Sequence, residues 1–228
     1  MKIAFTPDPL NGWHRVHHVR MMGLFEVVPV SEADIVFNWS TRSVYCPPVD
    51  GAVNGRLTDV SKTMVEYVFN CVYGYSSTVT DGMAVEKPVA EQGKKNARIV
   101  NLSLMQMQPG MIYQRVLCDI NSPVTKEDRY VVMRGVPVLL TRKTKHITPS
   151  NITGTTIDVE VMKPKEDSRI NEFCRQIGLD FGELDILTWK DKDYIIDVNN
   201  IAGDALFFGN NGNFVRDCYI ELFKKHYL

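Results

Sequence analysis

The sequence lacks the features of a secreted or membrane-spanning protein. Its 228 residues contain five cysteines, an odd number, and no two of them have the Cys-x-x-Cys spacing. Their wide spacing is typical of reduced cysteines in a protein interior rather than of a disulfide framework. Residues 1–14 have no apolar signal core, and no segment reaches the roughly 18 consecutive apolar residues that a membrane helix needs. We therefore expect a cytoplasmic protein with no membrane partner.

Several nucleotide-binding and hydrolytic motifs are also missing. There is no Gly-x4-Gly-Lys-Ser/Thr loop and no Gly-x-Gly-x-x-Gly turn, which argues against a P-loop nucleotidase and a Rossmann dehydrogenase. There is no Gly-x-Ser-x-Gly elbow, which argues against a serine hydrolase of that type. The 26 Lys and Arg residues are balanced by 27 Asp and Glu residues. The composition therefore gives no sign of a nucleic-acid partner.

The spacing of the apolar residues predicts an α+β protein. Residues 1–55 resemble a small α/β unit with strands at 2–6 and 33–39, and an amphipathic helix runs from Asp59 to Gly74. Turn signals such as Arg134-Gly135 join later strands as hairpins, so the sheets after residue 80 should be mostly antiparallel. We expect these later strands at 83–88, 97–102, 111–117, 128–133, 136–142, 182–188 and 193–199. Two further helices are expected, one from Asp167 to Gly178 and one at about 213–225.

Two acids and an asparagine stand out near the C-terminus. Asp185 lies inside an apolar strand, and Asp197 and Asn199 occupy positions i and i+2 of the next strand. Side chains alternate across a strand, so the last two share a face, and a hairpin would bring Asp185 beside them. Buried carboxylates repel each other unless a cation neutralises them, and oxygen ligands suit Mg²⁺. The alternative is that these acids lie at a hairpin edge in contact with water.

This arrangement resembles the C-terminal lobe of the ATP-grasp superfamily. In that family an acid on one strand and an acid-x-Asn on the next hold the magnesium ions that bridge the nucleotide phosphates, and Asp185, Asp197 and Asn199 match these positions. The family more often has Glu where this chain has Asp197. The resemblance covers roughly residues 56–209. It implies a two-lobed ATP-grasp fold, with an N-lobe at about 56–117 and a C-lobe at about 118–228, preceded by the small unit at 1–55.

The resemblance also implies nucleotide-binding residues in the N-lobe. Lys87 closes a strand and would hold the nucleotide phosphates, and the following polar loop, with Gly93 as its one glycine and Lys94 and Lys95 beside it, would fold over them. The alternative for Lys87 is a solvated lysine at the end of a strand. The segment after Tyr113 resembles the hinge between the lobes, where backbone groups meet adenine; its members are Gln114, Arg115, Val116 and Leu117. Asp119 or Asn121 would reach the ribose.

Two arginines resemble the catalytic cations of the same family. Arg129 and Arg142 would face the phosphates or an acyl-phosphate, although a hairpin containing an ion-paired arginine would give the same pattern. Asn151 and Gly154 match a loop that often crosses the active site in the family.

The resemblance implies an ATP- and Mg²⁺-dependent ligase, with Mn²⁺ as an alternative metal. A carboxylate would be activated as an acyl-phosphate and attacked by an amine or a similar nucleophile, and both substrates would be small molecules or peptides. A non-catalytic ATP-binding regulatory protein and a small-molecule kinase on the same fold remain open, as does a homodimer. The identities of the carboxylate and the nucleophile are not encoded in any motif.

A cluster of histidines is left over. His14, His17 and His18 could bind zinc, but no cysteine or acid completes a tetrahedral set nearby. A role in binding the acceptor or an anionic substrate is a second alternative, and otherwise the segment is a solvated helix.

Overall fold

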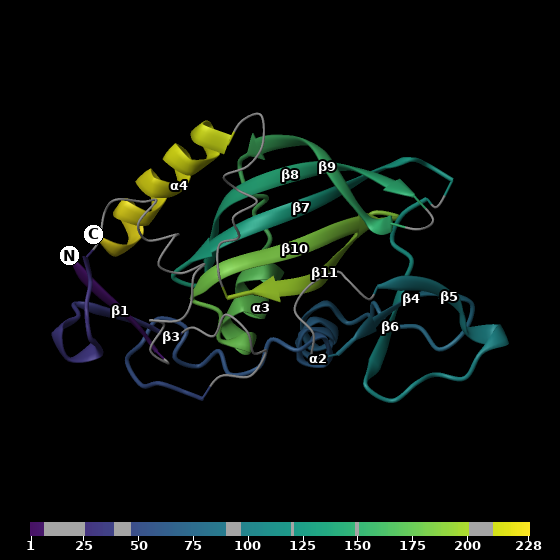
Figure 1. Cartoon of the computed structure of the whole chain (residues 1–228), viewed down its shortest axis with the longest axis horizontal. Helices are drawn as coiled ribbons and strands as arrows, with labels where there is room; N and C mark the ends of the chain where they lie inside the picture. Colours follow the sequence, from purple (N-terminus) through teal and green to yellow (C-terminus); the bar gives the residue numbers. More distant parts are fainter. Residues whose placement is uncertain (7–25, 39–46, 90–96, 120, 149–150, 201–211) are drawn as a thin grey trace.

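The residues that the structure describes form three β-sheets, with helices packed against the largest (Figure 1). None of the helices in the part of the chain that the structure describes is long and apolar enough to cross a membrane. The computed structural model describes residues 1–6, 26–38, 47–89, 97–119, 121–148, 151–200 and 212–228.

The largest sheet has five antiparallel strands in the order β11-β10-β7-β8-β9. Its strands are β7 (Val124–Met133), β8 (Val136–Thr148), β9 (Asn151–Met162), β10 (Phe181–Trp189) and β11 (Lys192–Asn199). Arg134 and Gly135 have φ of 51° and 76°, and Lys190 and Asp191 have φ of 50° and 61°. Positive φ at both central residues matches the right-handed twist of the flanking strands. The two expected hairpins are therefore confirmed.

The expectation of an active-site loop around Asn151 and Gly154 is wrong. These residues belong to β9, which pairs with β8 along the edge of the large sheet. Alternating β-branched and polar residues from Thr155 onward favour an edge strand with one solvated face. The pairing with β8 shifts register between Thr144 and Lys145.

Two helices cover one face of the large sheet. They are α2 (Lys62–Tyr73) and α3 (Ser168–Ile177), and each ends at a left-handed glycine, as the sequence predicts. The helix α2 begins after the cap residue Ser61, slightly later than the expected start at Asp59, whose carboxylate accepts the Ser61 backbone N–H. Even-numbered strand residues such as Tyr130, Val132 and Leu184 pack under these helices.

The opposite face of the sheet is divided between an aromatic core and a charged region. The core is formed with β1 (Lys2–Thr6), β3 (Ile35–Asn38) and α4 (Gly212–Tyr227), and β1 also pairs in parallel with β2 (Glu26–Val27). Phe37, Phe181 and Phe223 contact one another there. The side chain of Asn54 accepts the backbone N–H groups of Asp180 and Phe181, each at 2.8 Å. This face therefore joins the N-terminal strands to the large sheet.

The third sheet has the order β5-β4-β6 and lies at the other end of the molecule (Figure 1). Its strands are β4 (Met83–Pro88), β5 (Arg98–Asn101) and β6 (Met111–Arg115), and all pair antiparallel. Short 3-10 turns at Val30–Glu32 (η1) and Leu102–Leu104 (η2) complete the described elements. The small sheet lies beyond the charged end of the large sheet, which leaves a pocket between the two.

Candidate functional site

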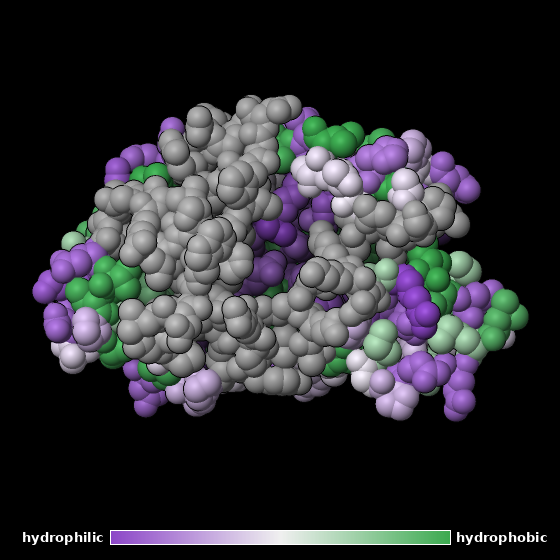
Figure 2. Space-filling view, viewed as in Figure 1, coloured by the Kyte–Doolittle hydropathy of each residue, from purple (hydrophilic) through white to green (hydrophobic). Residues whose placement is uncertain are grey.

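The pocket is lined by residues of both the small and the large sheet and by the start of α2. Figure 2 shows hydrophilic side chains at the bottom of a hollow on this face. The apolar part of the wall includes Val85, Ile99, Leu187 and Ile196. The polar part is formed by Lys62, Lys87, Gln114, Thr125, Glu127, Lys145, Asp185 and Asp197. An apolar slot with charges at one end suits a ligand that carries a flat ring and an anionic tail.

The expected acids lie together. Asp185 on β10 is directly opposite Asp197 on β11, and Glu183 is directly opposite Asn199. Directly paired residues of an antiparallel pair point to the same face, so all four side chains share the pocket face of the sheet. The register shifts just beyond Asp185, which leaves Ile196 as an extra residue in β11.

Gly182 permits the close approach of β10 and β11 at this point. It has φ of 153°, and a Cβ there would lie 2.1 Å from the carbonyl oxygen of Asn199. Any larger residue would push the two strands apart. The glycine therefore helps to set the position of Asn199 relative to the acids.

Arg129 is bound to two of these acids. Its Nε and Nη2 donate to the two oxygens of Asp185 at 2.6 and 2.9 Å, and its Nη1 lies 2.9 Å from a Glu183 oxygen. Burial alone would lower the pKa of the guanidinium, but Asp185 and Glu183 raise it above its ordinary value. The structure thus joins two expected site residues, Arg129 and Asp185, in one buried ion pair. Each carboxylate oxygen of Asp185 has a second lone pair that can still accept.

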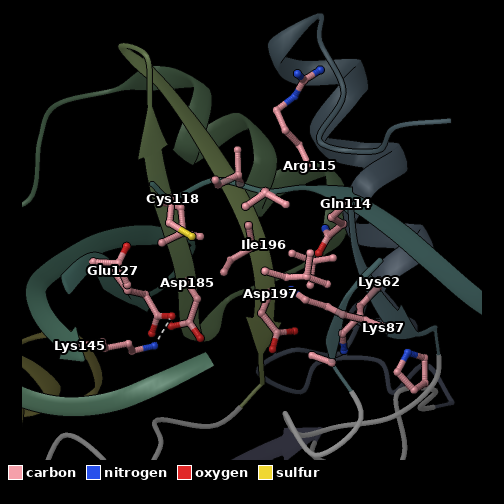
Figure 3. Close-up of a pocket in the computed structure, with 18 residues that line it drawn as sticks. Lys62, Lys87, Gln114, Arg115, Cys118, Glu127, Lys145, Asp185, Ile196 and Asp197 are labelled. Atoms are coloured by element: carbon pink, nitrogen blue, oxygen red, sulfur yellow. Dashed lines mark hydrogen bonds and ion pairs between the residues drawn. The ribbon is translucent and has the colours of Figure 1, made fainter. Parts of the chain in front are cut away.

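Asp197 faces charges of both signs. Burial raises the pKa of its carboxyl group, Lys62 lowers it, Asp185 raises it and Lys87 lowers it, with a net rise. Figure 3 shows its carboxylate between Asp185 on one side and the two lysines on the other. The surroundings therefore disfavour the bare ionised carboxylate, and a cation at this point would offset that.

Three further charged residues were not expected from the sequence. Glu127, Lys143 and Lys145 lie on the same face as Arg129, at alternate positions of β7 and β8. Lys145 forms an ion pair with Glu127, and the Lys143 ammonium lies 3.8 Å from the same carboxylate. Burial and the nearby Arg129 lower the pKa of Lys143. Charged residues at every second position of these two strands are the sequence signal that could have revealed Glu127, Lys143 and Lys145.

Lys62 was also missed. It is the first residue of α2, and it is buried beside the pocket. A lysine directly after a helix cap is usually exposed to water. Nothing in the neighbouring sequence indicates that this helix starts at a pocket. Its position beside Lys87 doubles the positive charge at this end of the wall.

The expected hinge residues Gln114, Arg115, Val116 and Leu117 all line the pocket. The side chain of Arg115 is exposed and extends away from the others in Figure 3, so its backbone faces the pocket. Gln114 is buried, and its amide oxygen has no hydrogen-bond partner among the described residues. Leaving such an acceptor unpaired costs about 1–3 kcal/mol, which a ligand with a suitably placed donor would recover.

Other expected site residues lie elsewhere. Arg142 is on the helix-covered side of the sheet, where its Nε and Nη2 donate to Asp128 at 2.7 and 2.8 Å. Asp119 is exposed, and its carboxylate accepts the backbone N–H of Asn121 in a turn. Neither is among the described residues that line the pocket. The loop with Gly93, Lys94 and Lys95, and the segment with His14, His17 and His18, lie outside the described residues.

Within the described part of the chain, no three His, Cys, Asp or Glu side chains form a group able to hold a metal ion by themselves. The expected donor set has two carboxylates and the amide oxygen of Asn199. Mg²⁺ is usually held by one or two carboxylates together with water and substrate phosphates. Asp185, Asp197 and Asn199 therefore fit Mg²⁺ that arrives with a phosphate ligand.

Comparisons with known proteins support the fold. No protein-family model and no curated protein matches the sequence. Among solved structures, the chain is similar to ATP-grasp ligase PsnB in complex with precursor peptide PsnA2 and AMPPNP, at 12% identity, a TM-score of 0.56 and coverage of 96% of this chain and 95% of that one. It is also similar to D-alanine–D-alanine ligase from Bacillus anthracis, at 9% identity, a TM-score of 0.51 and 99% coverage of both chains. D-cycloserine synthetase DcsG has 13% identity, a TM-score of 0.50 and coverage of 97% and 99%. At these identities the likeness shows a shared fold.

Proposed function

We propose that this chain, which has the ATP-grasp fold, binds ATP with Mg²⁺ and uses them to join a carboxylate to an amine or a similar nucleophile. One observation carries the proposal. Asp197 lies directly opposite Asp185 at the end of the pocket where Lys62 and Lys87 also lie. Carboxylates that could hold a metal and lysines that could contact phosphate therefore lie together, and the strand of Gln114 with the apolar wall would suit adenine.

The acids and the lysines would divide the charge of the triphosphate between them. Asp185, Asp197 and Asn199 would hold Mg²⁺, which supplies positive charge to the transferring phosphoryl group when it is bound. Lys62 and Lys87 would contact phosphate oxygens as point charges. Arg129, held by two carboxylates, would mainly fix the orientation of Asp185 rather than contact the phosphates. This role replaces the direct contact that the sequence predicts for Arg129.

The proposed reaction has two displacements. A carboxylate oxygen attacks the γ-phosphorus of ATP, the bond to the β-phosphate oxygen breaks, and ADP leaves. The amine then attacks the acyl carbon, phosphate leaves, and the amine proton passes to solvent or phosphate. The protein's part is to position the reactants and to exclude water, because phosphoryl transfer needs little covalent help.

Thermal unfolding with ATP, with Mg²⁺ and with both tests the binding step. A ligand that binds only the folded state stabilises the protein by about 2.7 kcal/mol when its concentration is 100 times its Kd. We expect this stabilisation only when ATP and Mg²⁺ are both present.

ADP release in pools of carboxylates and amines then tests turnover. An amide product supports a ligase, and a stable phosphate ester would instead identify a kinase. Absence of any ATP-dependent shift would contradict the proposal.

The Lys87→Met protein is expected to bind ATP–Mg²⁺ about 10- to 100-fold more weakly, because a charge-assisted hydrogen bond contributes about 1.5–3 kcal/mol. Isothermal titration calorimetry measures the difference. Lys126→Met makes the same chemical change at an exposed position of β7, and we expect it to alter the affinity by no more than about twofold. Equal affinities for the two variants would remove Lys87 from the phosphate site.

The Arg142→Met protein is expected to lose stability and to keep its ATP affinity. The arginine side chain is 24% exposed and its partner Asp128 is 6% exposed, so the variant leaves a largely buried carboxylate without its cation, at a cost of about 1–3 kcal/mol. Urea unfolding and calorimetry measure the two quantities. A loss of ATP affinity with unchanged stability would instead show that Arg142 contributes to the nucleotide site.

A further inference from the structure

A chain of hydrogen bonds behind the pocket connects Gln114 to a buried acid on α2. The Nε2 group of Gln114 donates to the Ser77 hydroxyl oxygen at 3.1 Å, and that hydroxyl donates to the Oε2 atom of Glu66. The exposed fractions of Gln114, Ser77 and Glu66 are 3%, 0% and 8%. The three residues therefore form a relay that water does not interrupt.

The other oxygen of Glu66 is also fixed. Its Oε1 atom accepts the backbone N–H groups of Ser77 and Thr78, at 2.7 and 3.3 Å, and the hydroxyl of Ser76. Every described group that forms a hydrogen bond with this carboxylate is a donor. The carboxylate is thus held as an acceptor at both of its oxygens.

The direction of each hydrogen bond follows from counting protons. An ionised carboxylate can only accept, so the single proton of the Ser77 hydroxyl points to Glu66. The hydroxyl can then only accept from Gln114, so the NH₂ end of the amide must face Ser77. This assigns the amide orientation from the network itself. The amide oxygen is left on the other side of the group, buried and with no donor among the described residues, in a residue that lines the pocket.

A hydrogen-bond acceptor on the Gln114 side chain favours a base whose edge carries a donor. Adenine carries an NH₂ donor at position 6, whereas guanine carries an oxygen acceptor there, and hypoxanthine does too. We propose that Glu66 and Ser77 are positioning residues that make the pocket selective for 6-aminopurine nucleotides by locking the Gln114 amide oxygen toward the base. This inference rests on the proposed function, because it requires that a purine nucleotide occupies the pocket.

Glu66→Gln is the sharpest test, because it can reverse the direction of the hydrogen bonds between residue 66, Ser77 and Gln114 with almost no change in side-chain shape. The three donors around Oε1 would keep the new amide oxygen at that position, which places the new NH₂ group at Ser77. The Ser77 hydroxyl would then donate to the Gln114 amide oxygen, and the Gln114 NH₂ group would turn toward the ligand. The pocket would now present a donor and favour the 6-oxo base.

The experiment measures the Kd of ATP and of inosine triphosphate, both with Mg²⁺, by calorimetry. We expect the wild-type protein to prefer ATP by about 10- to 100-fold, the effect of one matched against one mismatched hydrogen bond. In Glu66→Gln the ratio should fall at least about tenfold, toward or past equality. Ser76→Ala removes a hydroxyl from the same carboxylate without touching Gln114, so the ratio should stay at its wild-type value. If Glu66→Gln does not fold, Ser77→Ala, which frees the amide to rotate, should also bring the ratio toward equality.

The possible failures are distinct. A wild-type protein that binds neither nucleotide overturns the proposed function and this inference with it. A wild-type protein that binds both nucleotides equally, or a variant that folds and keeps the wild-type ratio, overturns the inference alone. A purely structural role for Glu66 would change stability and both affinities together, and would leave their ratio unchanged.

Discussion

The Asp197→Asn protein is expected to fold normally and to lose about 100-fold or more of its Mg²⁺-dependent ATP turnover. The charge that a metal supplies to a phosphoryl group is worth several kcal/mol, and each 1.4 kcal/mol is a factor of ten in rate. Asparagine keeps the shape of the side chain but weakens the hold on the metal. Stability should be unchanged or higher, because burial and the opposite carboxylate of Asp185 both raise the pKa of the wild-type Asp197 carboxyl group and so disfavour its charge.

Asp191→Asn is the matched control for this result. Asp191 lies in the two-residue turn between β10 and β11, with φ of 61°, a conformation that asparagine adopts readily. The change is chemically the same and lies in the same hairpin, yet it is remote from the pocket. We expect it to leave both turnover and stability as they are. Full turnover in the Asp197→Asn protein would place the metal elsewhere.

The Arg129→Met protein is expected to lose about 3–5 kcal/mol of stability, the usual cost of leaving a buried charge without its partner. Arg129 and Asp185 are 9% and 3% exposed, and Glu183 is fully buried. Removing the guanidinium leaves two carboxylates facing each other in the interior. The midpoint of urea unfolding measures the loss, which should exceed that of Arg142→Met because the Asp128 pair is more exposed.

A second change separates charge from packing at this ion pair. Adding Asp185→Asn to Arg129→Met removes one of the uncompensated charges, so the double variant should recover part of the lost stability. The recovery is an interaction energy, measured by a double-mutant cycle. Additive losses would mean that the two side chains do not interact in solution.

Local pattern predicted much of the fold and the pairing of the acids. The hairpin turn at Arg134-Gly135 follows from turn chemistry, and the strand at Met83–Pro88 has the expected bounds. The shared face of Asp197 and Asn199 follows from strand alternation, and a single hairpin brings in Asp185. These features depend on residues close together in the sequence, where periodicity is informative.

The parts that the sequence did not predict depend on distant pairing. Asp185 meets Arg129, which lies 56 positions earlier in the sequence, because β10 pairs with β7. No local signal says which strand lies beside β10, so the arginine was expected to face phosphate instead. The same holds for Gln114, whose amide orientation is set by a helix residue and a loop serine. The strand β9 was missed because its polar residues and Gly154 resemble a loop.

The most direct test of the central claim is a crystal structure with AMPPNP and Mg²⁺. The account predicts a metal that is bound by phosphate oxygens and by the side chains of Asp197 and Asn199, with Asp185 beside it and the adenine against the strand of Gln114. A nucleotide bound outside this pocket, or phosphates and metal remote from Asp197, would contradict it.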